Sequence, residues 1–194
     1  MNEFSPLLQY VNRHIQLNQQ EEEYFCSLLR YTRLRKKQYL IQPDYVCKYK
    51  SYVVKGCLRA FITDDKGEDY TLQFAVEDWW IADFGSFINQ VPATMIVEAI
   101  EDSELIQIDY NAVQLLYSQV PKFESFFRVI TERSYVFLQK RIISNISMTA
   151  EEKYRDFITR YPNIAARVPQ YAMASYLGIT TEFLSKIRRR LSES

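Results

Sequence analysis

The chain has 194 residues, and its 24 lysine and arginine side chains are balanced by 24 aspartate and glutamate side chains. Hydrophobic residues make up 47% of it, which is typical of a globular protein with a sizeable core and excludes an intrinsically disordered chain. The formal net charge of zero excludes a global field that attracts nucleic acid, so any such attraction has to be local.

Potential metal ligands and membrane segments are scarce. Cys26, Cys47 and Cys57 are odd in number and lack metal-ligand spacing, which argues against a disulfide framework and against a zinc or iron–sulfur site. His14 is the only histidine, so we expect no metal and no cofactor. The sequence shows neither a signal-peptide pattern nor an apolar run long enough for a membrane span, and we expect a cytoplasmic protein.

Two short helices are predicted at the N-terminus. Ser5 is a plausible helix cap with Pro6 as the first helical residue, while Asn18 and Glu21 have the spacing of a cap pair. From Arg33 onward the pattern changes to short β-rich segments separated by Gly or acidic turns. These predicted strands cover residues 38–41, 52–54, 58–63, 70–74, 96–100 and 105–108.

The strand predicted at residues 58–63 belongs to a β-hairpin. Leu58, Ala60 and Ile62 alternate with Arg59 and Phe61, and the turn at residues 64–67 leads into the next strand. No helix long enough for a crossover separates the predicted strands. Many short strands at regular intervals therefore favour a sandwich or jelly-roll barrel over a parallel sheet.

A long helix is predicted from residue 122 to about residue 145, because no Gly or Pro interrupts this apolar-rich segment. Its apolar surface is wider than one neighbour needs, so we expect it to serve both the barrel and a second subunit. The alternative is a helix buried in one large core. A capping box at Thr149 and Glu152 begins the next helix, which Pro162 ends, and we place a domain boundary near Ser147.

Residues 169–191 have the pattern of a helix-turn-helix. An apolar helix ends at Gly178, which can adopt the left-handed conformation, and Thr180 is placed to cap a second helix. Phe183, Leu184, Ile187 and Leu191 are predicted to form the buried stripe of that second helix. The side chains expected to contact DNA are Thr180, Thr181, Glu182, Ser185, Lys186, Arg188 and Arg189.

In such motifs, residues near the start of the second helix reach base edges, and later Lys and Arg residues neutralise phosphates. Glu182 can accept a hydrogen bond from a cytosine amino group, and Lys186 can donate one to guanine or to phosphate. The alternative for this segment is a solvated helical hairpin with a basic end, because base contacts cannot be deduced from spacing.

The order of barrel, long helix and helix-turn-helix resembles the Crp/Fnr family of bacterial transcription regulators. Residues 52–59, YVVKGCLR, are similar to the strand–Gly–strand signature of its cyclic-nucleotide-binding barrel, and residues 65–68 are similar to its hairpin. Residues 169–191 resemble the helix-turn-helix of a branch of small regulators. The resemblance implies an α+β fold with a jelly-roll, cyclic-nucleotide-binding-like barrel at residues 1–120. It also implies a dimerisation helix at 121–146 and a winged-helix-like helix-turn-helix domain at 147–194.

The resemblance also assigns recognition residues. Those that read bases in the family correspond by position to Thr181, Glu182 and Lys186, and many relatives carry Arg at the first and third of these positions. Lys cannot reproduce the bidentate contact of Arg with guanine, so the family's usual operator is not expected here.

In the barrel, the resemblance places the phosphate-binding cassette at residues 82–94. Asp83 falls where the ribose-binding Glu is expected, Ala93 falls where the phosphate-binding Arg is expected, and no basic residue lies between Lys66 and Lys122. We therefore expect cyclic AMP to bind poorly or not at all. The candidate residues of this degenerate effector pocket are Asp83, Phe84, Gly85, Ser86, Ala93 and Thr94. Trp79 and Trp80 with Phe74, Phe84 and Phe87 can line an apolar cavity, although such a cluster is more often core.

The sequence thus predicts a non-enzymatic, sequence-specific DNA-binding regulator that acts as a homodimer on double-stranded DNA. RNA polymerase is a further candidate partner. The regulator either responds to an unidentified small-molecule effector or has none. A metal-dependent cupin-type enzyme needs several His and carboxylate ligands, which one histidine cannot supply. The remaining alternative is a barrel-based ligand-binding or protein-interaction module without DNA binding.

Overall fold

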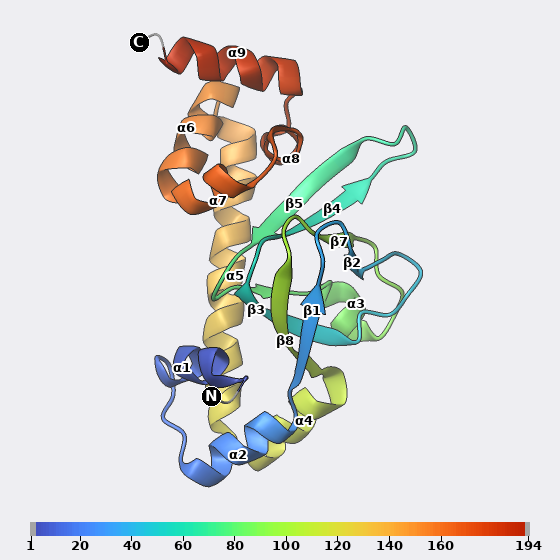
Figure 1. The fold of residues 1–194 in the computed structure, drawn as a ribbon, viewed down its shortest axis with the longest axis vertical. Helices are drawn as coiled ribbons and strands as arrows, with labels where there is room; N and C mark the ends of the chain where they lie inside the picture. The colour runs from blue at the N-terminus through green and yellow to red at the C-terminus, as the bar shows by residue number, and fades with distance from the viewer. Residues whose placement is uncertain (1–2, 193–194) are drawn as a thin grey trace.

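The computed structural model describes residues 3–192, and its helices and strands follow the predicted order (Figure 1). Before the barrel and within it lie α1 (Ser5–Asn12), α2 (Gln19–Ser27), β1 (Arg30–Leu34), β2 (Tyr39–Ile41), β3 (Tyr49–Lys55), β4 (Leu58–Thr63), β5 (Asp69–Ala75), β6 (Trp80–Ile81), α3 (Phe84–Asn89), β7 (Ile96–Ala99), β8 (Ser103–Asp109) and α4 (Tyr110–Gln119). The rest of the described chain is helical, with α5 (Lys122–Ser147), α6 (Ala150–Arg160), α7 (Pro162–Arg167), α8 (Gln170–Leu177) and α9 (Thr181–Ser192).

The strands form two antiparallel four-stranded sheets, in the orders β1-β8-β3-β6 and β2-β7-β4-β5. This arrangement confirms the predicted jelly-roll barrel. Gly56 joins β3 to β4 with a φ of 108°, and a Cβ atom there would lie 2.7 Å from the Ser103 Cα, so only glycine is accommodated. No helix among the described residues has the length and apolar character needed to cross a membrane.

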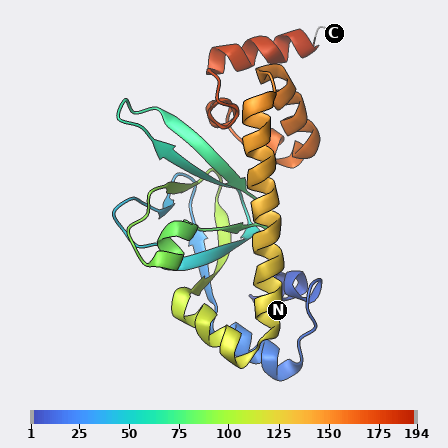
Figure 2. The same ribbon diagram turned by 180° about the vertical axis from the view of Figure 1, so that it is seen from behind.

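The long helix α5 runs along the whole molecule, beside the barrel and up to the C-terminal helices (Figure 1, Figure 2). Its first turns are anchored in the barrel core, because Phe123, Phe126, Phe127 and Ile130 are all buried. Further along, the side chain of Ile142 is 59% exposed and that of Ile146 is 82% exposed. The alternative of a helix buried in one large core is therefore wrong for the second half of α5.

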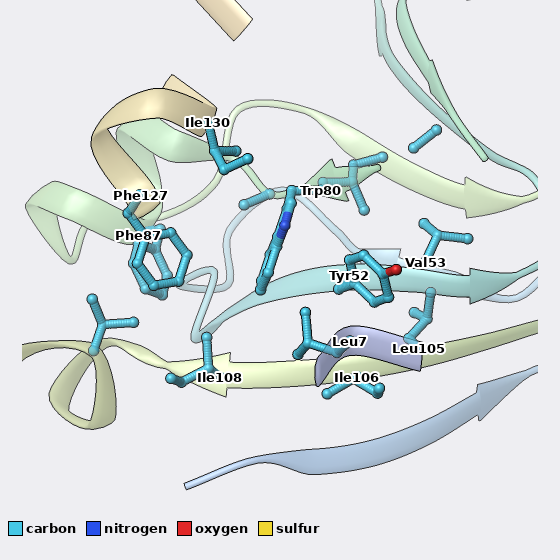
Figure 3. Close-up of a cluster of buried hydrophobic side chains, with 14 of the residues drawn as sticks. Leu7, Tyr52, Val53, Trp80, Phe87, Leu105, Ile106, Ile108, Phe127 and Ile130 are labelled. Atoms are coloured by element: carbon cyan, nitrogen blue, oxygen red, sulfur yellow. The ribbon is translucent and has the colours of Figure 1, made fainter. Parts of the chain in front are cut away.

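The core of the barrel lies between its sheets and on the face that α1, α4 and α5 cover (Figure 3). The C-terminal helices have a second core around Phe157, Met173, Leu177 and Leu184. The capping box of Thr149 and Glu152 begins α6 as predicted. Residues 148–192 are helical apart from short connections, so no wing strand lies among them.

Several local predictions are corrected by the structure. Phe4 is the cap of α1, and Ser5 and Pro6 are its first helical residues. Strand β1 was not predicted, because its sequence RYTRL lacks a regular apolar alternation. In β4, Arg59 and Phe61 are buried together with Leu58 and Ala60, since one of the C-terminal helices covers the face that the alternation left to solvent.

Candidate functional site

The helix-turn-helix forms as its sequence predicts. Gly178 has a φ of 70° at the end of α8, and the Ile179 N–H donates to the Ala174 carbonyl at 3.1 Å, which closes the helix. The Thr180 hydroxyl oxygen accepts a hydrogen bond from the Phe183 N–H at 3.2 Å and so begins α9.

The buried stripe of α9 is narrower than predicted. Leu184 and Ile187 are buried as expected, but Phe183 is 44% exposed and Leu191 is only partly covered. The prediction of a four-residue stripe is therefore wrong at Phe183. Because this ring lies on the surface, α9 offers an apolar group beside its basic ones.

The candidate DNA-binding residues lie on the outer face of α9. Glu182, Ser185, Lys186, Arg188 and Arg189 are exposed. Thr180 is also exposed, and Thr181 is half-buried. Within residues 3–192, no ion pair ties the cations at positions 186, 188 and 189 to a carboxylate of the protein. Their charges are therefore available to a partner.

Arg190 behaves differently from the neighbouring cations of α9. Its guanidinium group lies 3.2 Å from the Glu151 carboxylate, at the start of α6. Glu151 also pairs with Arg155, 3.1 Å away on the next turn of α6. Arg190 thus contributes to the packing of the C-terminal helices, whereas the cations before it face outward.

Glu182 is held in its ionised form. Its own backbone N–H, the Thr180 hydroxyl and the nearby Lys186 ammonium stabilise the carboxylate, and together they lower the pKa of Glu182 below its usual value. An ionised carboxylate accepts hydrogen bonds and does not donate them. Glu182 can therefore accept from a base amino group but is repelled by phosphate.

Gln170, on α8, is a functional candidate that sequence reasoning missed. Its side-chain amide donates to the Ser185 hydroxyl oxygen at 2.5 Å and to the Thr181 carbonyl at 3.4 Å. The Ser185 hydroxyl donates in turn to the same carbonyl at 2.9 Å. Gln170 thus orients the start of α9. In the sequence, the only sign of this role is that Gln170 lies in the first turn of the helix that precedes α9.

The β4–β5 hairpin contacts α8, so the barrel holds the helix-turn-helix directly (Figure 1). The Arg59 guanidinium is 1% exposed and donates to the Thr71 hydroxyl at 2.7 Å and to Asp69 at 3.0 Å. It also reaches the Ser175 hydroxyl of α8 at 3.4 Å. Ser175 accepts from the Thr71 N–H at 2.8 Å, which joins α8 to strand β5.

The polar side chains among the predicted effector residues are hydrogen-bonded to other parts of the protein. The Asp83 carboxylate accepts from the N–H groups of Ser86 at 3.0 Å and Thr94 at 2.9 Å. Burial favours its neutral form, but hydrogen bonds from these two N–H groups and from that of Met95 outweigh burial and lower the pKa of Asp83. Asp83 is thus an acceptor already occupied by the loop it caps.

The other cassette residues offer little to a bound anion. The Ser86 hydroxyl donates to the Val91 carbonyl at 2.5 Å and accepts from the Cys47 N–H at 2.8 Å. Ala93 is buried, and its N–H donates to the Tyr45 carbonyl at 2.9 Å. Gly85 lies in the first turn of α3, and Phe84 is 37% exposed.

Lys50, on β3, is a cation near the cassette that the sequence reading missed, because it lies far from that segment in the chain. Its ammonium group is 5.2 Å from the ring centre of Phe87 and 5.7 Å from that of Phe84, both on α3. It is 4.7 Å from that of Phe127 on α5. Burial lowers the pKa of Lys50 to about 8.

Metal and thiol chemistry find no support at these sites. Among residues 3–192, no group of histidine, cysteine and carboxylate side chains is arranged to hold a metal ion. Burial raises the pKa of the Cys57 thiol to about 12 and also raises that of Cys47. Both thiols are therefore protonated at neutral pH and weakly nucleophilic.

Comparison with known proteins agrees with this architecture. Residues 31–119 match the family described as the cyclic nucleotide-binding domain. No curated protein has a significantly similar sequence. FixK2 from Bradyrhizobium japonicum is 17% identical with a TM-score of 0.74, and the match covers 85% of each chain.

Two further structures match most of the chain. CLP from Xanthomonas campestris, described as a c-di-GMP-responsive global regulator, is 14% identical with a TM-score of 0.69 over 91% of this chain and 92% of its own. A transcriptional regulator assigned to the Crp/Fnr family, from Eubacterium rectale, is 16% identical with a TM-score of 0.71 over 91% and 84%. Part of the chain thus matches the cyclic nucleotide-binding domain family, and the chain as a whole shares the fold of these regulator structures.

Proposed function

We propose that this chain is a cytoplasmic, sequence-specific DNA-binding transcription regulator of Crp/Fnr type that acts as a homodimer and does not respond to cyclic AMP. The observation that carries the proposal is the outer face of α9. There Lys186, Arg188 and Arg189 are exposed and not ion-paired within the described residues, on a helix-turn-helix of the expected geometry.

A second copy of the chain is proposed to cover the exposed apolar face of α5. Tyr135, Leu138 and Ile142 are spaced by three and four residues, and their side chains are 66%, 49% and 59% exposed. This spacing forms a coiled-coil seam, which is stable only when a partner helix packs against it. In this scheme residues 1–120 sense, residues 121–146 dimerise and residues 147–194 bind DNA.

Base recognition is assigned to the start of α9. Thr181, Glu182 and Lys186 are proposed to contact base edges, with Glu182 accepting from a cytosine amino group. Thr180, Ser185, Arg188 and Arg189 are proposed to contact the phosphate backbone. A lysine at position 186 makes the preferred operator differ from one read by an arginine there.

The proposed lack of response to cyclic AMP rests on the cassette. Its Asp83 is already hydrogen-bonded to the loop, and Ala93 supplies no charge for a phosphate. Lys50 is close, but its ammonium group lies against three aromatic rings. Titration calorimetry is expected to give no binding at micromolar cyclic AMP, and a micromolar dissociation constant would overturn this part of the proposal.

The test of DNA binding uses operators selected from a random duplex pool. Binding of the selected duplex should weaken steeply with salt, and the double variant Lys186→Ala with Arg188→Ala should make the slope of log K against log salt shallower by about two. The matched control is Lys66→Ala with Arg128→Ala, which removes the same charge elsewhere and should leave the slope unchanged.

The same experiment separates the alternative function. If no duplex is enriched, or if the control pair flattens the slope as much as the α9 pair, DNA recognition by α9 is wrong. The protein would then be a ligand-binding or protein-interaction module built on the barrel.

A further inference from the structure

The Lys50 ammonium group lies in a box of three aromatic rings. It extends from β3 and is 4.7 Å from the ring centre of Phe127, 5.2 Å from that of Phe87 and 5.7 Å from that of Phe84. Phe127 belongs to α5, and the other two rings belong to α3. The cation thus lies where the barrel, the cassette and the long helix meet.

No carboxylate balances this charge. Within residues 3–192, the Lys50 side chain has neither an ion pair nor a hydrogen bond. Burial by itself lowers the pKa of Lys50 to about 8, and no charged side chain of the described parts of β8, α3 or α5 contributes to this shift. Aromatic rings attract a cation, but they replace only part of its hydration. A neutral group therefore suits this position better than an ammonium group.

The nitrogen of Lys50 remains open to a small reagent. In the part of the chain that the structure describes, the polar side-chain atoms that are fully enclosed and lack a partner are Asn12 Oδ1 and Trp80 Nε1. Lys50 Nζ also lacks a partner but is not one of these atoms, so it keeps contact with solvent. Phe87 and Phe127 are buried, whereas Phe84 is 37% exposed, which places the open side of the box at Phe84.

We propose that Lys50 is an acylation site, at which a small activated acyl group is transferred to the side-chain amine and remains there as a neutral amide. With an acetyl group carried by phosphate, the amine nitrogen attacks the carbonyl carbon and a C–N bond forms. The C–O bond to phosphate breaks, and the phosphate leaves with the electron pair and takes up the proton that the nitrogen loses. The amide then lies against the rings without a buried charge.

The expected rate at Lys50 depends on how much of the amine is neutral. At pH 7 about one tenth of an amine with a pKa of about 8 is neutral, against about one in 3,000 at the ordinary value of 10.5. A less basic group is also a weaker nucleophile, and a Brønsted slope of about 0.5, as for thiols, returns roughly 20-fold of this 300-fold gain. Acetylation of Lys50 should therefore be about tenfold faster than that of an exposed lysine.

The test uses the full-length protein with acetyl phosphate as the probe and needs no DNA. Mass spectrometry of peptides measures the initial rate of acetylation at each lysine. The exposed Lys48, two residues earlier in the chain, is the matched control. At pH 7 Lys50 should react about tenfold faster than Lys48. At pH 10 the order should reverse, because an exposed lysine is then partly neutral and the stronger nucleophile.

The variant Phe84→Ser separates this explanation from simple exposure. Removing the ring lets water reach the ammonium group, so at pH 7 the rate at Lys50 should fall towards that at Lys48. If exposure alone set the rate, the same variant would speed up the reaction. The control Ile88→Ser removes a side chain of the same helix that is 57% exposed and should leave the rate at Lys50 unchanged.

Two results would overturn the proposal. One is acetylation of Lys50 at pH 7 that is no faster than that of Lys48, and the other is a faster reaction of Lys50 in Phe84→Ser. Circular dichroism checks the fold of each variant. If Phe84→Ser does not fold, the comparison of the two lysines in the parent protein still decides the outcome. Neither result bears on DNA recognition by α9, because acylation of Lys50 does not rest on it.

Discussion

Lys50 carries a positive charge into aromatic surroundings. Its ammonium group lies within 6 Å of the ring centres of Phe84, Phe87 and Phe127. No ion pair with a carboxylate is found for it in the described part of the chain. The attraction between a cation and aromatic rings offsets only part of the lost hydration, which is why the pKa falls to about 8.

Because the pKa of Lys50 is lowered on folding, the stability of the protein depends on pH. In the unfolded chain the amine has its ordinary value of 10.5, so between pH 8 and 10.5 the unfolded state binds a proton that the folded state has released. Lys50 therefore lowers the free energy of unfolding below pH 8. This penalty shrinks as the pH rises from 8 to 10.5, so the stability of the protein increases through this window.

We predict that Lys50→Met stabilises the protein by roughly 1–3 kcal/mol at pH 7, because it removes a partly buried charge. The advantage should disappear near pH 10.5. Urea unfolding of both proteins at several pH values measures it, with the exposed Lys48→Met as control. A stability difference that does not change between pH 7 and pH 10.5 would contradict the assignment.

At the scale of elements, the β4–β5 hairpin and α8 form one polar junction with the long helix. The Arg141 guanidinium of α5 donates to the carbonyls of Thr71 at 2.5 Å, of Leu72 and, at 3.4 Å, of Tyr176. Arg59 is covered from outside by Tyr171, whose ring centre is 5.3 Å away. The hairpin, α5 and α8 are therefore linked through two arginines, of which Arg59 is buried and Arg141 is partly buried.

A second contact joins the barrel to the C-terminal helices. Arg167 of α7 donates to Glu77 at 2.7 Å and to Glu101 at 2.9 Å. Hydrogen bonds from the guanidinium to Glu101 and Glu77 raise the pKa of Arg167 above its ordinary value, so it stays charged. Two separate junctions fix the orientation of the helix-turn-helix on its own barrel more firmly than one would.

Arg59→Met tests the hairpin junction. Removing this arginine takes the ion pair from Asp69 and one hydrogen bond each from Thr71 and Ser175. We expect a loss of about 2–4 kcal/mol in the free energy of unfolding. Hydrogen exchange should show the loss concentrated in α8. The surface control Arg30→Met should change the stability by less than about 0.5 kcal/mol. Unchanged exchange in α8 would show that the junction does not hold the motif.

At the scale of the whole molecule, α5 connects two separate hydrophobic cores. The first half of this helix completes the barrel core, and the core of the C-terminal helices lies beyond its midpoint. Between and beyond them, Ile142, Ile143 and Ile146 leave a large apolar surface in water. Such a surface is costly unless a partner covers it.

The pair Ile142→Glu with Ile146→Glu is therefore expected to convert a dimer into a monomer in sedimentation experiments. Both cores are intact in the variant, so its circular dichroism should not change. Affinity for a two-half-site operator should fall by at least about tenfold, since each monomer engages one half-site only. Gln114→Glu with Gln119→Glu on α4 is the matched control. A monomeric parent protein would refute the dimer directly.

Local structure was largely predictable because the signals are local. Gly178 and Thr180 set the turn between α8 and α9 through their own conformations and side chains, and the structure confirms both. Helix α4, by contrast, was missed although Asp109 caps it by accepting from the Ala112 N–H at 2.8 Å. In the sequence, an acidic residue directly after a predicted strand was the signal for the start of this helix.

The amino-acid order by itself determined the succession of barrel strands, long helix and helix-turn-helix, because periodicity, caps and glycines act over a few residues. Only the tertiary structure decided that Arg59 is buried, that Asp83 is occupied and that Lys50 lies beside the cassette. Each depends on a contact between segments far apart in the chain, and the energy of burying a charge or satisfying a donor is set by those neighbours.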